Sequence, residues 1–373
     1  MPAVPVTVPE TMPVPVPETT LVTVPAPKLG RVDNQAFPWP PGSATGIGSM
    51  PGTDPEEAMR VIAGELEGFP YLAELPARGP GADLTGRTAA LLVDMPAEVT
   101  PRGWRLAERP GRDLARARAM LSSDLDVLEE VLQDFEGPVK VAIAGPWTLA
   151  STLELQRTMN MALADPGAVA DLTASLAEGA AAFVADVAKR VPGARLVVQL
   201  DEPALPSVLA GAVPTQSGWS RLAAVEEHTA IERLSQVLAA VPAFTVVHCC
   251  AATVPFGIIQ SAGASAISFD LGQLRREESD GVAEAAEAGP GLLTGAVPAI
   301  TVEPGGARET ASRVTRLWRW IGLPPQTAAP QVVITPACGL AGASPAQARA
   351  VLARCREAAA ILPEMIETGG EAR

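Results

Sequence analysis

The chain has 373 residues, 47% of them hydrophobic and 19% charged, and its 42 acidic and 28 basic side chains give a formal net charge of −14. This charge would repel a phosphate backbone or an anionic membrane, so we expect neither nucleic acid nor membrane as a partner. No stretch offers the roughly 18 uninterrupted apolar residues of a spanning helix, no basic leader opens the sequence, and the few cysteines make a poor disulfide framework. These features predict a soluble, cytoplasmic protein with reduced thiols.

Proline and valine dominate the start of the chain, where proline recurs every two or three positions. Proline at this density excludes helix and removes the N–H donors that a sheet needs, which leaves extended or disordered chain. The sequence therefore predicts a disordered tail over residues 1–32, without a part in the chemistry, and a catalytic domain over residues 33–373.

Short apolar runs follow from about residue 42, separated by longer stretches of helical period. Most of the runs are continuously apolar, which is typical of strands covered on both faces and therefore of a parallel sheet. The eight predicted strands lie within residues 44–51, 88–96, 139–146, 194–203, 244–251, 265–271, 292–299 and 331–339.

Helix start signals stand in the stretches between these runs. Pro55 follows Asp54, and Pro345 follows Ser344, which places a proline in the first turn after a capping residue. Eight strands alternating with helices predict one (β/α)8 barrel rather than an open doubly wound sheet. No glycine-rich dinucleotide or phosphate loop follows any of the strands, which weakens the doubly wound alternative further.

The reactive side chains lie at the carboxyl ends of predicted strands, where a barrel has its active site. His248 and Cys250 are two residues apart, so both point to one side of the strand and Cys249 points away. Together with Cys338 they offer the thiolate and imidazole ligands that zinc prefers, and a catalytic zinc site keeps a further position exchangeable. The alternative is ordinary buried cysteines beside a hydrogen-bonded core histidine, and Cys355, within a helical stretch, is predicted to be structural.

Four sequence blocks and a weaker fifth form a recognisable pattern. They are IGSMP at 47–51, QLDEPAL at 199–205, HCC at 248–250, PACGL at 336–340 and, more weakly, GPWTLA at 145–150. The pattern resembles the catalytic C-terminal barrel of cobalamin-independent methionine synthase, within the wider group that includes uroporphyrinogen decarboxylase and corrinoid-dependent coenzyme M methyltransferases. The resemblance covers nearly the whole chain after the tail.

The resemblance implies a zinc site. His248, Cys250 and Cys338 would be ligands, and the family's fourth ligand is a glutamate at the end of the next strand. The matching residue here is Asp270, which is one methylene shorter. Asp270 is therefore expected either to bind the zinc directly or to support a ligand from behind.

The resemblance also implies how homocysteine is held. Asp201 would act at the catalytic site by binding the substrate ammonium group, with Glu74 as a second ammonium partner. Ile47 and Ser49, with neighbouring backbone amides, would bind the carboxylate. The alternatives are a helix cap or a loop hydrogen bond for Asp201 and a surface position for Glu74, while Glu202 is expected to pack behind the site.

The implied activity is zinc-dependent transfer of a methyl group to the thiol of homocysteine, giving methionine. Zinc would lower the pKa of the bound thiol so that the thiolate exists near neutral pH. The chain has no room for the second barrel that helps full-length members hold a folate polyglutamate, so the donor stays open between a methylfolate, a methyl-corrinoid protein and a small sulfonium or betaine-like compound. Two alternatives remain: a metal-free enzyme like uroporphyrinogen decarboxylase, and a non-catalytic zinc-binding barrel.

Overall fold

A parallel β-sheet forms the centre of the computed structural model, which describes residues 37–158, 160–300 and 305–368. Seven strands pair in the order β1-β10-β9-β8-β7-β6-β4, and every neighbouring pair is parallel. In sheet order they are β1 (Ser43–Ala44), β10 (Val332–Pro336), β9 (Gly291–Val297), β8 (Ala266–Asp270), β7 (Phe244–Cys249), β6 (Ala194–Asp201) and β4 (Gly137–Ala144). The tail predicted over residues 1–32 lies outside the described residues and stays a prediction.

The two edges of this sheet are bridged by residues 70–74. On one side the Leu72 N–H donates to the Lys140 carbonyl of β4 over 2.8 Å. On the other side the Glu74 N–H donates over 3.0 Å to the carbonyl of Gly48, which follows β1. The sheet therefore curls until both edges meet the same segment, which confirms the predicted α/β class with a barrel-like parallel sheet.

One predicted strand is wrong. Residues 88–96 hold the end of helix α2 (Leu84–Ala89) followed by turns. Their apolar side chains are mostly buried, but a short apolar run fits a buried helix as well as a strand. Residues 70–74 take the place expected of the second strand, and the other seven predicted runs each overlap a strand of the sheet.

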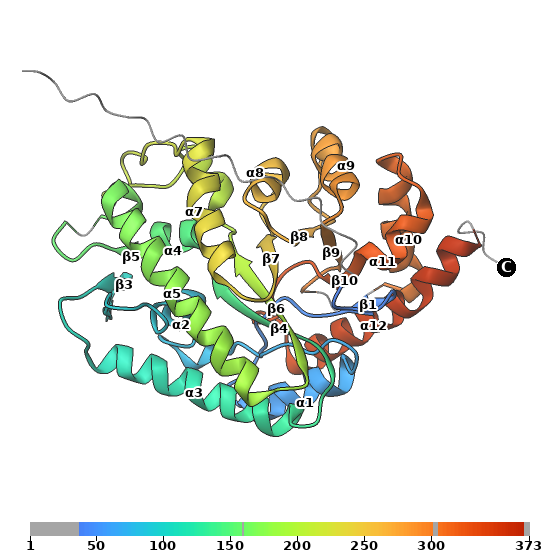
Figure 1. The fold of residues 1–373 in the computed structure, drawn as a ribbon, viewed down its shortest axis with the longest axis horizontal. Helices are drawn as coiled ribbons and strands as arrows, with labels where there is room; N and C mark the ends of the chain where they lie inside the picture. The colour runs from blue at the N-terminus through green and yellow to red at the C-terminus, as the bar shows by residue number, and fades with distance from the viewer. Residues whose placement is uncertain (1–36, 159, 301–304, 369–373) are drawn as a thin grey trace, which may run out of the picture. The chain divides into compact units, whose positions relative to one another are not determined.

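Helices surround the sheet (Figure 1). A smaller sheet pairs in the order β2-β3-β5, with strands at Ala97–Thr100, Gly103–Leu106 and Leu153–Glu154. The α-helices are α1 (Pro55–Glu65), α2, α3 (Arg112–Leu132), α4 (Pro146–Thr152), α5 (Pro166–Arg190), α6 (Leu205–Leu209), α7 (Glu227–Ala240), α8 (Phe256–Ser261), α9 (Ser279–Ala288), α10 (Ala307–Trp320), α11 (Ala328–Gln331) and α12 (Pro345–Glu367). Short 3-10 helices cover Pro76–Arg78, Ala162–Ala164, Arg276–Glu278 and Pro325–Thr327.

The two predicted helix starts are confirmed. The Asp54 carboxylate accepts hydrogen bonds from the N–H groups of Glu56 and Glu57, at 2.9 and 3.2 Å, and caps α1. Ser344 caps α12, since its hydroxyl accepts from the Gln347 N–H at 3.3 Å. Both caps satisfy N–H groups that have no partner within the helix.

Helix α5 is long and apolar enough, by length and composition alone, to cross a membrane. However, 56% of its apolar window is buried inside the protein, where it packs against β6 and α7. A buried core helix passes the same test of length and composition. The cytoplasmic location stays a prediction.

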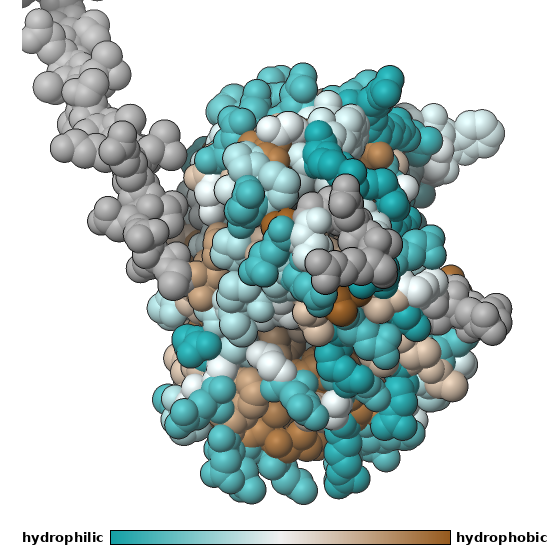
Figure 2. Space-filling view, turned by 90° about the vertical axis from the view of Figure 1, so that its right-hand side faces the viewer, coloured by the Kyte–Doolittle hydropathy of each residue, from teal (hydrophilic) through white to brown (hydrophobic). Residues whose placement is uncertain are grey.

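Stacked aromatic rings fill the amino-terminal end of the sheet, opposite the strand ends that carry the reactive residues. Trp39 stacks on Phe37 and Phe69, with ring centroids 5.2 and 5.8 Å apart, and meets Phe244 edge-on at 5.0 Å. The outer surface contrasts with this core, since the face shown in Figure 2 is largely hydrophilic, with hydrophobic residues gathered toward its lower edge. Because these rings fill the amino-terminal end of the sheet, a site is expected at the carboxyl-terminal ends of the strands.

Candidate metal and substrate site

Three of the predicted metal ligands come together at the carboxyl end of the sheet. His248 lies near the end of β7, Cys250 directly follows that strand, and Cys338 follows β10. Their ligand atoms all lie within 4.8 Å of one another. Because β8 and β9 separate these strands in the sheet, the three side chains meet across its mouth rather than along one edge.

The imidazole of His248 is held in one orientation. Its Nδ1 makes a 2.9 Å hydrogen bond with the hydroxyl of Ser268, which lies opposite it on β8. Its Nε2 is buried and has no hydrogen-bond partner within the described residues. A buried nitrogen without a partner is costly, and metal-binding histidines commonly present one nitrogen while the other is fixed by a hydrogen bond. The imidazole therefore fits a metal at Nε2.

The sulfurs of Cys250 and Cys338 are 3.5 Å apart and hydrogen-bonded to each other. The bond to Cys250, helped by His248, lowers the pKa of Cys338 to about 4, while the same bond and burial raise the pKa of Cys250. One of the two sulfurs is thus readily a thiolate. Tetrahedral zinc with Zn–S bonds of ~2.3 Å holds two sulfurs about 3.8 Å apart, so the pair needs little movement to bind zinc.

A cavity of about 250 Å³ opens beside this cluster. It brings the predicted substrate-binding residues to the predicted ligands, since its walls include Ile47, Gly48, Ser49, Glu74, Asp201, His248, Cys250, Cys338 and Gly339. The two loops that carry Ser49 and Gly339 fit tightly, because the Leu340 N–H donates to the Ser49 carbonyl at 2.8 Å and a Cβ at position 339 would collide with the Ser49 hydroxyl. The close fit fixes one wall of the cavity.

Two buried carboxylates face this cavity. Burial raises the pKa of Glu74 to about 7, and it also raises the pKa of Asp201. Gln199 donates to Asp201 at 2.7 Å, and the Arg87 Nε lies 3.8 Å from the Glu74 Oε1. Glu74 is only 6% exposed, so the surface alternative for this residue is wrong. Buried carboxylates that line a small cavity are suited to binding an ammonium group.

Comparison with known proteins decides the family. The catalytic-domain model of the cobalamin-independent synthase family matches residues 42–361. The chain belongs to the cobalamin-independent methionine synthase family. No curated protein matches it in sequence.

Solved structures agree with this family at the level of the fold. The structure of a B12-independent methionine synthase from Shewanella sp. W3-18-1, in complex with selenomethionine, is similar with a TM-score of 0.59 and 13% identity, covering 88% of this chain and 99% of that one. The similarity to the tryptophan synthase a2b2 complex of the hyperthermophile Pyrococcus furiosus is weaker, with a TM-score of 0.38 and 12% identity, covering 88% of this chain and 98% of that one. Family and fold together indicate a methyltransferase of the methionine synthase type.

Asp270, at the position of the family's fourth ligand, is not among the clustered ligand atoms. Its Oδ1 accepts from the Gly272 N–H at 2.7 Å, and its Oδ2 accepts from the Gln273 side chain at 3.1 Å. The same Gln273 amide donates to the Cys250 carbonyl at 3.0 Å. Asp270 is therefore connected to a ligand through Gln273, and its direct binding to a metal stays a prediction.

Glu202 packs behind the site, as the sequence predicts. Its carboxylate accepts from the backbone N–H groups of Trp147 and Thr148, at 2.9 and 2.7 Å, and from the Thr148 hydroxyl at 2.7 Å. These bonds provide acceptors for backbone N–H groups at the start of α4. Burial nevertheless raises the pKa of Glu202 to about 7. In this member of the family Glu202 joins β6 to α4.

Sequence reasoning missed the charged groups beneath the cavity. Lys140, in the middle of β4, is completely buried, and the sequence does carry a signal for it, since it is the one charged residue of the apolar strand GPVKVAIA. Arg87 and Asp124 form a buried ion pair of 2.7 Å behind Glu74. They lie 37 residues apart in sequence, and nothing local indicates the contact.

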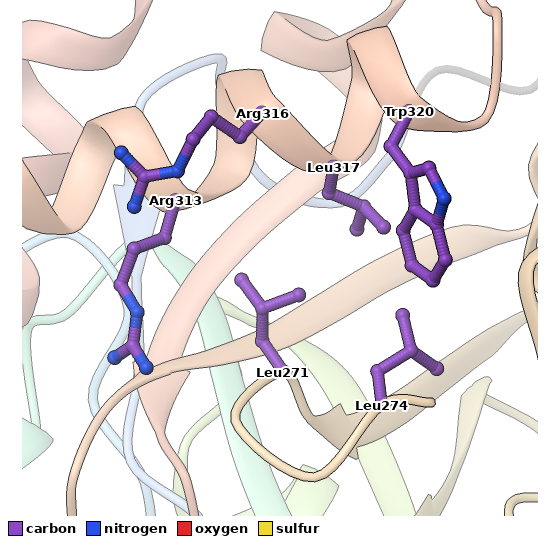
Figure 3. A pocket seen from close by; sticks show the side chains of 6 residues that line it. All are labelled: Leu271, Leu274, Arg313, Arg316, Leu317 and Trp320. Atoms are coloured by element: carbon purple, nitrogen blue, oxygen red, sulfur yellow. The ribbon is translucent and has the colours of Figure 1, made fainter. Parts of the chain in front are cut away.

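A second hollow, of about 300 Å³, lies between α10 and the turn after β8 (Figure 3). Arg313 and Arg316 stand at one end of it and Trp320 at the other, with Leu271, Leu274 and Leu317 between them. None of the predicted site residues lines it. The family's chemistry therefore belongs to the smaller cavity beside the three ligands.

Proposed function

We propose that the chain transfers a methyl group to the thiol of homocysteine and forms methionine. The observation that carries the proposal is the buried, unpartnered Nε2 of His248 beside the sulfurs of Cys250 and Cys338, in a cavity that also holds Glu74 and Asp201. A thiol-activating centre and an ammonium-binding wall in one small cavity suit an amino acid that carries a thiol. We further infer that residues 70–74 complete a closed (β/α)8 barrel.

His248, Cys250 and Cys338 would hold a zinc ion, with Asp270 as a further ligand or support. When bound, zinc supplies Lewis acidity that lowers the pKa of a coordinated thiol. The chain itself orients the ligands. Ser268 fixes the His248 imidazole, and Gln273 donates hydrogen bonds to both the Cys250 carbonyl and Asp270. A non-catalytic zinc-binding barrel is disfavoured by the cavity, since a purely structural site has no use for a substrate-sized space beside its ligands.

The substrate is oriented by both ends of its amino acid group. Asp201 and Glu74 bind the ammonium group, and Ser49, with the backbone of Ile47 and Gly48, binds the carboxylate. The substrate sulfur then lies toward the cysteines. Overall the sulfur–methyl bond forms, the bond between the methyl group and the donor nitrogen breaks, and the donor nitrogen takes the proton that the thiol gives up.

A methylated folate is the donor that membership of the family implies, and nothing in the structure supports a corrinoid protein. The test is methionine formation from homocysteine with 5-methyltetrahydrofolate, its triglutamate and methylcobalamin offered separately. We expect one zinc per chain and methionine from a folate donor. Full activity of metal-free protein, or no methionine from any donor, would contradict the proposal, and decarboxylation of a uroporphyrinogen would favour the metal-free alternative.

We expect homocysteine to bind more tightly as the pH rises through about 7. Burial raises the pKa of Glu74 to about 7, so this residue is neutral below that pH and becomes a carboxylate above it. Only the carboxylate attracts the substrate ammonium group, so the Kd for homocysteine should fall by about tenfold between pH 6 and 8.

The variant Glu74→Gln isolates this effect, because its side chain is the same size and does not titrate. Calorimetric titrations at several pH values should show a shallower pH dependence for the variant than for the wild type. Equal pH dependence in the two proteins would assign the change to another group and remove Glu74 from the ammonium site.

A further inference from the structure

An ammonium group is buried beneath the substrate cavity. Lys140 on β4 is 0% exposed, and its Nζ donates to the carbonyl of Ile47 at 2.5 Å. The Gln199 amide donates to the same carbonyl at 3.0 Å, and the Lys140 Nζ lies 5.3 Å from the ring centroid of Tyr71. Burying a charged amine is costly, and burial lowers the pKa of Lys140 to about 8. A residue kept at this cost calls for a function.

Both donors act on one peptide group. The bond between Ile47 and Gly48 is trans, as are all the described peptide bonds, so its carbonyl and its N–H point in opposite directions. Lys140 and Gln199 draw the carbonyl down into the barrel. The Gly48 N–H therefore points away from Lys140 and Gln199, and Gly48 is one of the residues that line the cavity.

The backbone N–H groups of the two residues after Ile47 have no acceptor among the described residues. Within the described residues, neither the Gly48 N–H nor the Ser49 N–H donates a hydrogen bond to a protein atom. The Gly48 carbonyl, in contrast, accepts from Glu74 at 3.0 Å, and the Ser49 carbonyl accepts from Leu340 at 2.8 Å. The loop is thus fixed through its carbonyls, while the Gly48 N–H remains available to an anionic group of a ligand.

We propose that Lys140 is a positioning residue for the substrate carboxylate. Together with Gln199 it sets the Ile47–Gly48 peptide so that the Gly48 N–H faces that carboxylate, and it places a positive charge near an anionic group. The proposal rests on the proposed function, because it assumes an amino acid substrate. It makes Lys140 the residue by which the site distinguishes an amino acid thiol from a simple aminothiol.

The experiment compares homocysteine with 3-mercaptopropylamine, which keeps the thiol and the amine but has no carboxylate. Binding of each to the zinc-loaded protein is measured by calorimetry without a methyl donor, so that methyl transfer is not required. In Lys140→Met, we expect the Kd for homocysteine to rise about tenfold or more and the Kd for 3-mercaptopropylamine to stay within about twofold. In turnover, KM for homocysteine should rise while kcat stays within about threefold.

Lys189→Met is the matched control, since Lys189 is exposed on α5, and it should bind both compounds as the wild type does. An equal loss for both compounds in Lys140→Met would overturn the proposal and make Lys140 a packing or ammonium-site residue. No loss for homocysteine would overturn it as well.

If Lys140→Met does not fold, the wild type still tests the carboxylate subsite on which the proposal depends. Homocysteine should then bind at least about tenfold more tightly than 3-mercaptopropylamine, and equal affinities would show that no carboxylate subsite exists. Failure of the proposed function looks different, because in that case homocysteine would not bind to the wild type at all.

Discussion

Cys250→Ser and Cys338→Ser should each lose bound zinc and activity. Serine keeps the size of cysteine, but its hydroxyl does not ionise near neutral pH and is a poor substitute for a thiolate at zinc. Each change also breaks the 3.5 Å contact between the two sulfurs. We expect zinc to fall well below one per chain and kcat/KM to fall by more than about 100-fold, as measured by metal analysis and methionine formation.

The other two cysteines supply the controls. Cys249 points away from the cluster and Cys355 lies within α12, and both are completely buried. Alanine is the suitable replacement here, because a serine hydroxyl would be left without a partner. Cys249→Ala and Cys355→Ala should keep zinc and activity with a modest loss of stability. Retention of zinc by Cys250→Ser would remove this residue from the ligand set.

Asp124→Ala should be among the most destabilising single changes in the protein. Asp124 is 2% exposed and accepts from Arg87 at 2.7 Å and from Arg78 at 2.6 Å. Its removal leaves two guanidinium groups, one of them deeply buried, without that carboxylate. A buried charge without its partner costs about 3 to 5 kcal/mol, so we expect a loss of that size in the free energy of unfolding, measured by urea denaturation.

Asp126→Ala is the matched control on the same helix. Asp126 also forms an ion pair, with Arg190 at 2.7 Å, but its side chain is 65% exposed. Exposed pairs contribute less than about 1 kcal/mol, so this variant should unfold close to the wild type. Similar urea midpoints for Asp124→Ala and Asp126→Ala would show that the buried network does not stabilise the fold.

Continuous apolar runs predicted most of the sheet, because strands covered on both faces are apolar at every position. The second strand position was missed, since residues 70–74 form a short segment that begins with Pro70. Their pairing with Lys140 and Gly48 depends on the closed arrangement of the whole sheet. The run at 88–96 was placed wrongly because its apolar residues serve a helix that covers the sheet. Local pattern alone does not distinguish these two uses of a short apolar segment.

The site was predictable where it depends on local spacing. The two-residue step from His248 to Cys250 fixes their common side, and the position of Cys338 at a strand end brings it to the same mouth. The surrounding charges depend instead on tertiary contacts. Lys140 acts through the backbone of Ile47, which is 93 residues away in sequence, and no residue type or spacing indicates such a contact.

The ligands come from the end of β7 and from the loop after β10, with two strands between them in the sheet, and Cys250 and Cys338 are 88 residues apart in sequence. An ion bound between them would link the last quarter of the barrel to its middle. Its binding free energy would therefore stabilise the folded state. Zinc starvation would then reduce the abundance of the enzyme as well as its turnover, because chains without bound zinc would unfold and be degraded more often.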